Sequence, residues 1–228
     1  MNNFKTVLLF LTILLSGCGL YESHTPPADH YYLNPDKDLD TVGRIALVEL
    51  SNDSAFPRIS SQATEALFQA LQKKQIFGLA IVRRHDPAWR SFQLDLNTAY
   101  TLEQLSAMRK TLNCDAVLVG AVTEFKPYPH MGIGLRLKIV DLTDGQLLWA
   151  LEQIWDATDR ATEERIMDYY SDHDLVGFAT LRERLGTVSS LKFVKFVAYE
   201  TAETLRPERQ GGMKLLLSPK KSVNFRKK

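Results

Sequence analysis

In the first half of the chain, short apolar runs alternate with segments whose apolar residues recur every three or four positions. Residues 45–50 and 79–82 are apolar runs of strand length. Residues 59–71 between them show helical spacing of apolar positions. A Thr-x-x-Gln capping pattern at Thr101 opens a second helical segment that ends near Leu112. The pattern predicts the order strand, helix, strand, helix.

Three further strands are predicted in the second half. Residues 116–122 are almost continuously apolar, as in a strand that is covered on both faces. Apolar and polar residues alternate over 133–140, and a glycine-containing turn at 141–146 leads to a partner strand at 147–155. Because parallel strands need crossover helices and the last two strands form a hairpin, the sheet must be mixed.

Helices are expected to complete the domain. Residues 156–186 mix acidic residues with arginines, which predicts short exposed helices, and apolar positions from Leu191 to Leu205 predict a closing helix. The predicted fold class is therefore α/β, a single mixed-sheet domain in the order βαβαβββ followed by helices. This domain is expected to span residues 43–206, with a basic tail at 207–228.

The N-terminus has the character of an export signal, with one positive charge followed by the apolar run 7–15. As a helix this run would span about 14 Å, roughly half of the hydrocarbon core of a bilayer, so a membrane-spanning helix is not expected. The run ends in a motif that resembles the lipobox of bacterial lipoproteins: Leu15, Ser16, Gly17 and Cys18. The resemblance implies a signal peptide at 1–17, a thioether-linked diacylglycerol on Cys18, and a further acyl chain such as palmitate on its amine.

The segment 18–42 is predicted to be the lipidated cysteine and a flexible tether, because it holds three prolines and shows no regular period. Two or three acyl chains anchor a protein stably where a single chain does not. Gly19 follows the cysteine, where an aspartate would favour inner-membrane retention in lipoprotein sorting. This resemblance implies that the acyl chains bind the outer membrane, with the domain on its periplasmic face.

Composition and charge exclude several classes of function. The formal net charge of +1 gives no general attraction to nucleic acid. Cys114 is the single cysteine besides Cys18, so a chain that is lipidated on Cys18 has no partner for an internal disulfide. The histidines are scattered without metal-ligand spacing, and no serine-nucleophile elbow is present. We therefore assign no catalytic residue, no metal site and no cofactor, and expect no enzymatic activity.

Two features could contact an anionic polymer or a protein partner. The C-terminal tail is basic, and either binds anionic polymer or is a solvated chain end. Trp149 and Trp155 share one face of a predicted strand, and either belong to the core or form an exposed aromatic surface. The basic candidates are Lys220, Lys221, Arg226, Lys227 and Lys228.

Three segments carry a resemblance to a known family. They are VELSND at 48–53, DAVLVGAVT at 115–123 and LRLKIVD at 135–141, followed by Gly145 and Leu148-Trp149. They resemble the curli-secretion lipoprotein superfamily, which includes flagellar outer-membrane lipoproteins, activators of penicillin-binding proteins, the Pel export lipoprotein and the N-terminal domain of the Tol propeller protein. The resemblance implies a periplasmic α/β domain that acts through assembly or through contacts with other envelope proteins.

The chain departs from the curli channel itself, which adds membrane-spanning hairpins to this fold. The corresponding segments, 83–100 and 156–190, lack the alternating strands of about 10 residues that a transmembrane barrel requires. The sequence thus predicts a lipid-anchored scaffold, accessory subunit or regulator of an envelope assembly or export machine, with homo-oligomerisation left open. The alternatives are a binding module for anionic peptidoglycan or polysaccharide and, more remotely, a periplasmic hydrolase.

Overall fold

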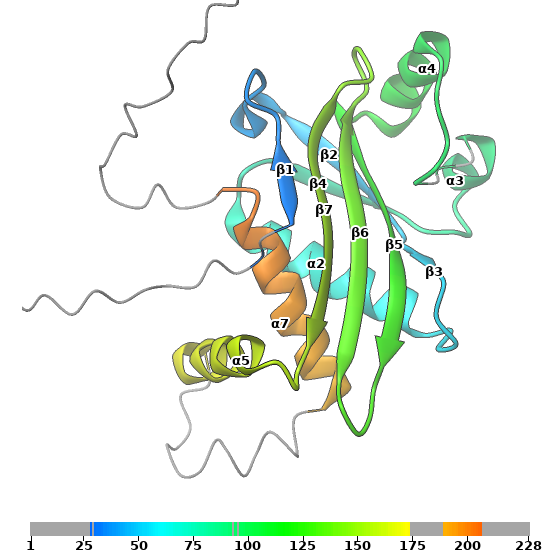
Figure 1. The fold of residues 1–228 in the computed structure, drawn as a ribbon. Coiled ribbons are helices and arrows are strands. Elements are labelled where there is room, and N and C mark those ends of the chain that lie inside the picture. The colour runs from blue at the N-terminus through cyan, green and yellow to red at the C-terminus, as the bar shows by residue number, and fades with distance from the viewer. Residues whose placement is uncertain (1–27, 29, 93, 95, 174–188, 207–228) are drawn as a thin grey trace, which may run out of the picture.

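A seven-stranded sheet forms the centre of the structure, a computed structural model that describes residue 28, residues 30–173 apart from 93 and 95, and residues 189–206 (Figure 1). The strands follow the order β1-β7-β6-β5-β2-β4, and β3 pairs with β5. The strands are β1 (Tyr31–Leu33), β2 (Arg44–Val48), β3 (Ser51–Asn52), β4 (Gly78–Val82), β5 (Ala116–Lys126), β6 (Gly132–Asp141) and β7 (Leu147–Asp156). The helices are η1 (Leu39–Thr41), α2 (Ile59–Lys74), α3 (Pro87–Phe92), α4 (Leu102–Leu112), α5 (Arg160–His173) and α7 (Ser190–Glu203).

This arrangement confirms the predicted mixed α/β fold. β2 runs parallel to β4 and β5, whereas β5, β6, β7 and β1 are antiparallel neighbours. The capping box predicted at Thr101 is present, and Thr101 accepts a hydrogen bond from the backbone N–H of Gln104. The pattern missed the short elements β1, β3 and α3. Among the described residues, no helix is both long enough and apolar enough to span a bilayer.

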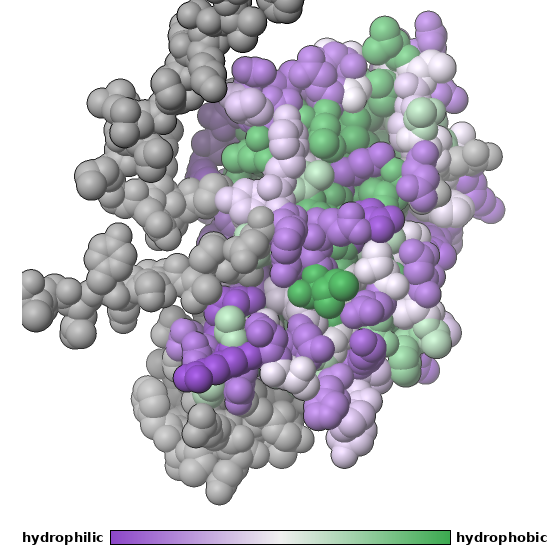
Figure 2. All heavy atoms as spheres, in the orientation of Figure 1, coloured by the Kyte–Doolittle hydropathy of each residue, from purple (hydrophilic) through white to green (hydrophobic). Residues whose placement is uncertain are grey.

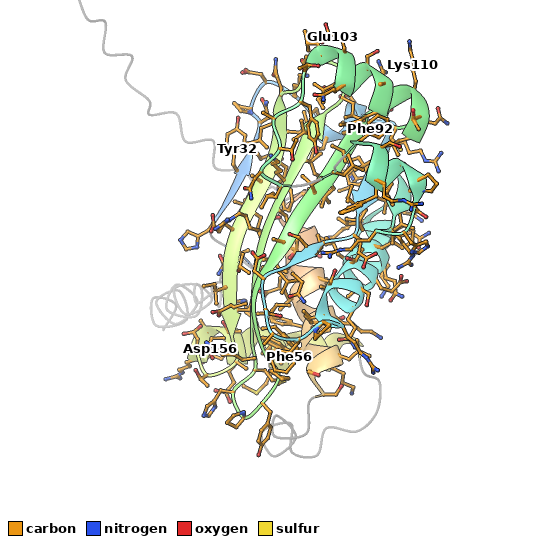
Figure 3. All side chains as sticks on the ribbon, turned by 90° about the vertical axis from the view of Figure 1, so that its right-hand side faces the viewer. Tyr32, Phe56, Phe92, Glu103, Lys110 and Asp156 are labelled. Carbon is orange, nitrogen blue, oxygen red and sulfur yellow. The ribbon has the colours of Figure 1, made fainter. Side chains whose placement is uncertain are left out.

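Helices cover the two faces of the sheet unequally. α2 and α7 pack side by side on one face and, with the sheet, enclose the larger apolar core (Figure 1). On the other face, α3 and α4 cover the end formed by β2, β4 and β5. The side view in Figure 3 places Glu103 and Lys110 of α4 at one end of the molecule and Phe56 and Asp156 at the opposite end. No described helix covers this second face over β6 and β7.

The connections between the parallel strands explain why both faces of β5 are buried. The chain passes from β2 through α2 to β4 on one face, and returns from β4 through α3 and α4 to β5 on the other. Leu118 and Val122 of β5 belong to the core with α2 and α7, whereas Val117 and Val119 pack toward α4. The continuous apolar run at 116–122 follows from this position, because a strand that alternates between two covered faces needs apolar residues at every position.

The packed domain begins earlier than residue 43, the boundary expected from the sequence. Ala28 is 2% exposed in the main core, and β1 pairs with β7 from Tyr31 to Leu33. Lys37 then ties this segment to the turn between β6 and β7, since its Nζ lies 2.6 Å from Asp141 Oδ2 and 2.6 Å from Asp144 Oδ2. The described part of the expected tether is therefore attached to the sheet edge through strand pairing and ion pairs.

The Lys37 contacts predict an acid-sensitive contribution to stability. Burial raises the pKa of Asp141, but hydrogen bonds from Lys37 and Thr143 outweigh burial and hold this pKa below its ordinary value. A carboxylate of this kind stabilises the fold above its unfolded-state pKa, and the stabilisation is lost as the pH falls through the folded-state pKa. Lys37→Met should therefore lower the free energy of unfolding at pH 7, and its difference from wild type should shrink below about pH 4. Urea denaturation at pH 7 and pH 3 measures both values.

Lys126→Met is the matched control, because Lys126 Nζ lies 3.9 Å from Glu124 Oε1 and its side chain is 63% exposed. This control should change stability little at either pH. If Lys37→Met lowered the free energy of unfolding equally at pH 7 and pH 3, this would contradict the role assigned to the ion pair between Lys37 and Asp141.

Candidate functional site

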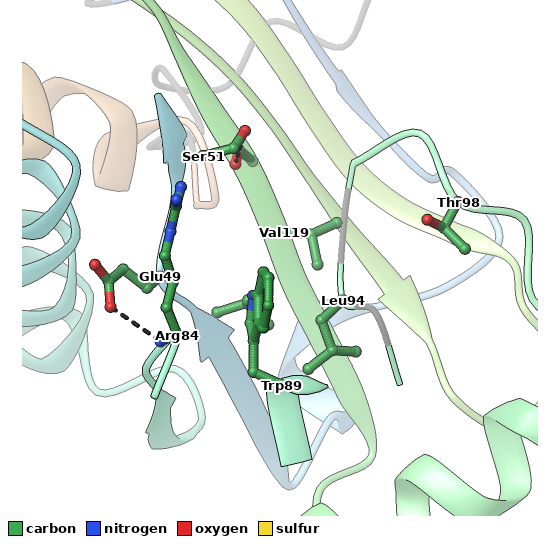
Figure 4. A pocket seen from close by; sticks show the side chains of 9 residues that line it. Glu49, Ser51, Arg84, Trp89, Leu94, Thr98 and Val119 are labelled. Carbon is green, nitrogen blue, oxygen red and sulfur yellow. Dashed lines mark hydrogen bonds between the residues drawn. The ribbon is translucent and has the colours of Figure 1, made fainter. Parts of the chain in front are cut away.

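A pocket of about 350 Å³ lies on the α3 side of the sheet, beside β2 and β5 (Figure 4). Its lining residues come from the end of β2, from β3, from the middle of β5, and from the segment that contains α3. They are Val48, Glu49, Ser51, Arg84, Trp89, Leu94, Thr98, Val119 and Gly120. The volume is at the lower end of the range of about 300–1,000 Å³ that is typical of small-molecule sites.

The strand ends position the polar residues of the pocket. β2 ends at Val48, and the backbone N–H of Glu49 still donates to the carbonyl of Val82, 2.8 Å away. One residue past Leu50 the chain pairs with β5 as β3, and Ser51 Oγ donates to the carbonyl of Gly120 at 3.2 Å. These bonds fix Glu49 and Ser51 at the edge of the pocket.

Arg84 supplies the cationic group of the pocket. Its backbone N–H donates to Glu49 Oε2 at 3.1 Å, and its Nη2 donates to the carbonyl oxygen of Leu50 at 3.1 Å. The same carbonyl accepts a hydrogen bond from Ser60 Oγ at the start of α2. Among the described residues the Arg84 guanidinium has no carboxylate partner, so most of its N–H groups are available to a ligand.

The remaining wall of the pocket is mainly apolar. α3 begins at Pro87, a residue whose fixed φ suits the first helical position, and it carries Trp89 over the sheet. The close-up in Figure 4 shows Trp89 beside Val119 and Leu94. The pocket thus combines one guanidinium, hydroxyl groups and an aromatic surface.

A second candidate surface is the part of the sheet that the described helices leave uncovered. We call it the open face and define it by Arg136 and Lys138 of β6 and by Ala150, Glu152 and Ile154 of β7. Arg136 Nη2 lies 2.7 Å from Glu152 Oε1, and this hydrogen bond lowers the pKa of Glu152. Ile154 is 58% exposed. Figure 2 shows apolar residues among polar ones on this side of the molecule.

Trp149 and Trp155 share one face, as predicted, but both side chains are 0% exposed. Neither can contact a polymer or a partner at the surface of the described domain, which corrects that interpretation in favour of a core role. Each indole N–H has an acceptor on or next to α7, because Trp149 Nε1 donates to Thr204 Oγ1 at 3.1 Å and Trp155 Nε1 donates to Glu200 Oε2 at 2.6 Å.

Several predicted site residues lie outside the described residues. These are the lipobox with Cys18 and the basic tail residues, and their roles stay predictions. Cys114 is buried, and burial raises the pKa of its thiol, in keeping with a structural role. Within the described ranges, no cluster of three or more His, Cys, Asp or Glu side chains is placed to hold a metal ion.

The sequence pattern did not identify Glu49, Arg84 and Trp89 as residues of a pocket. Arg84 and Trp89 lie in the segment 83–100, for which the sequence pattern predicted neither a helix nor a strand, so neither apolar periodicity nor motif spacing identified them. The available signal was their position after parallel strands, since ligands in open α/β sheets bind beyond the carboxyl ends of such strands.

No protein-family model and no curated protein sequence matches the chain. A PelC dodecamer from Paraburkholderia phytofirmans is similar in structure at 14% identity over 74% of this chain and 94% of that chain, with a TM-score of 0.40. Lipoprotein GNA1162 from Neisseria meningitidis matches at 13% identity over 57% of this chain and 96% of that one, with a TM-score of 0.42. The LpoB C-terminal domain from Salmonella enterica matches at 19% identity over 50% and 83%, with a TM-score of 0.37.

One of these neighbours, GNA1162, is a lipoprotein. Similarities with TM-scores this low nevertheless carry no argument about family or activity, so neither is assigned to this chain from them.

The ion pair beneath Trp155 gives a test of the core. Glu200 is 2% exposed, and its Oε1 lies 2.6 Å from Arg165 Nε, whose side chain is 17% exposed. Arg165→Leu should lower the free energy of unfolding by about 3 kcal/mol, because it removes the cation from a buried carboxylate. Combining it with Glu200→Gln should recover part of this loss, since the amide oxygen can still accept from Trp155. Urea denaturation of the three variants measures the coupling.

Arg160→Leu on the same helix is the control. Arg160 Nε lies 3.0 Å from Glu164 Oε1, but the two side chains are 90% and 56% exposed, so the change should be within about 0.5 kcal/mol. If Arg165→Leu and Arg160→Leu lowered the free energy of unfolding equally, the buried pair of Arg165 and Glu200 would not stabilise the packing of α5 on α7.

Proposed function

We propose that the protein is a non-enzymatic outer-membrane lipoprotein that serves as an accessory subunit, scaffold or regulator of an envelope assembly or export machine. The lipobox at Leu15–Cys18 in front of a folded α/β domain is the observation that carries this proposal. It implies a stable lipid anchor on a domain that acts beside the membrane.

The structure limits how far this domain can move from the proposed anchor. Ala28 is the first described residue, it is buried in the core, and it lies ten residues beyond Cys18. A fully extended chain covers at most about 3.3–3.6 Å per residue, so ten residues reach about 35 Å. The anchor therefore keeps the domain close to the membrane surface, where envelope machines assemble.

The open face supports contact with another protein. It combines the exposed apolar side chain of Ile154 with a cation and an anion, Arg136 and Glu152. An uncovered sheet face of this mixed character can bury apolar area against a partner and set its orientation through charge.

The lipid anchor is tested first. Cys18→Ser should abolish incorporation of labelled palmitate and should remove the protein from the outer-membrane fraction of a sucrose gradient. The matched control is Cys114→Ser, which should retain both the label and the membrane fraction. Palmitate incorporation by Cys18→Ser would contradict the assigned lipidation site.

The accessory role is tested by photocross-linking in intact cells. A photoreactive residue replaces Ile154 on the open face or, as a control, Leu102 at the start of α4, which is 64% exposed. Position 154 should give a discrete adduct with one envelope protein, and this adduct should weaken in the Cys18→Ser background because the local concentration falls. Position 102 should not give the same adduct. Adducts only with general abundant proteins, or identical adducts from both positions, would contradict the proposal.

A further inference from the structure

The pocket lies at a topological switch point of the sheet. From β2 the chain proceeds through α2 toward β4, whereas from β5 it proceeds in the opposite direction across the sheet into β6. The pairing of β2 with β5 ends at Leu47 and Leu118, and β3 resumes pairing with β5 at Ala121. The pocket opens between these two points, beside Val119 and Gly120. This is the position at which ligands bind in open α/β sheets.

The groups that converge there define the chemistry of a ligand. Arg84 presents a planar fork of N–H donors, which matches the two oxygens of a carboxylate. Trp89, Leu94 and Val119 provide an apolar wall opposite, which fits a compact hydrocarbon group. Ser51 and Thr98 add hydroxyl groups that can donate or accept. The set suits a carboxylate that is attached to an apolar group.

Glu49 restricts the charge of this ligand. Its Oε2 accepts from the backbone N–H of Arg84, so a carboxylate is held beside the cation without pairing with the guanidinium itself. A phosphate carries about −1.5 to −2 charges, and its stronger attraction to Arg84 is offset by its stronger repulsion from Glu49, so the second charge gains little over the single charge of a carboxylate. One guanidinium beside one acid therefore favours a monoanion.

We infer that this pocket binds an apolar carboxylate, the chemistry of a peptide C-terminus whose last side chain is aliphatic. The site depends neither on the lipid anchor nor on the open face, so it extends beyond the proposed function. A free aliphatic acid shares this chemistry, and the experiment distinguishes it from a peptide end.

Tryptophan fluorescence provides a direct measurement. The chain has three tryptophans, and Trp149 and Trp155 are both 0% exposed in the core, whereas Trp89 lines the pocket. The mature chain in mild detergent is titrated with N-acetyl-Ala-Leu, with its C-terminal carboxamide and with 4-methylpentanoate. We expect the fluorescence to change saturably with the dipeptide acid. The carboxamide should bind at least tenfold more weakly. Tighter binding of the dipeptide than of 4-methylpentanoate assigns the peptide end, and equal binding assigns the free acid.

Arg84→Gln should weaken binding of the dipeptide acid by about tenfold or more, since a hydrogen bond to a charged group contributes about 1.5–3 kcal/mol. Arg84→Lys should fall between wild type and Arg84→Gln, because it keeps the charge but loses the planar fork. The matched control is Arg90→Gln, an exposed arginine on α3 that does not line the pocket, and it should bind as wild type.

Thr98→Phe tests the pocket without changing its charge and should also abolish the response by filling the cavity. Circular dichroism checks that each variant is folded. Three results would overturn the inference: no saturable response to either acid, equal responses to the acid and the carboxamide, or tighter binding of D-glucuronate, which would assign an acidic sugar. These outcomes do not depend on the photocross-link at position 154. The proposed function and the ligand of the pocket can therefore be refuted independently of each other.

Discussion

The arrangement of the whole domain depends on the burial of β5 on both faces. Parallel strands cannot be joined by a tight turn, so β2, β4 and β5 need crossover connections, and the two crossovers lie on opposite faces. Val117, Leu118 and Val119 consequently point alternately into two cores, and each is at most 1% exposed. Gly120 continues this tight packing, since a Cβ there would lie 2.7 Å from the backbone oxygen of Arg136 and would collide with Leu137.

Both candidate surfaces follow from this constraint. α3 and α4 serve the return crossover to β5, so they cover one end of their face and leave the antiparallel strands β6 and β7 open. The pocket forms under the edge of the same crossover, where Trp89 of α3 extends over the point at which β2 and β5 separate. The asymmetry of helix cover thus produces both an uncovered sheet face and a cavity beside it.

The sequence predicted those elements whose signal is local. The runs at 45–50 and 116–122 and the alternation at 133–140 reflect which faces are covered, so the main strands were found. β1 was missed because its pairing partner Leu151 lies 120 residues away from Tyr31. Spacing placed Trp149 and Trp155 on one face, but it could not tell that this face packs against α7. Arg84 and Trp89 become neighbours of Val119 only through the crossover, which no local pattern records.

The position of the N-terminal segment separates the attachment of the proposed anchor from the pocket. β1 pairs at the outer side of β7, whereas the pocket lies between β5 and β2, so β7 and β6 intervene. With strands about 4.8 Å apart, the two sites are separated by roughly 15 Å or more across the sheet. The open face, in contrast, includes β7 itself, and Glu152 donates its backbone N–H to the carbonyl of His30. If Cys18 carries the proposed lipid anchor, tension on it acts on the strand that presents Ile154, while the geometry around Arg84 is held by Glu49, Leu50 and the start of α2.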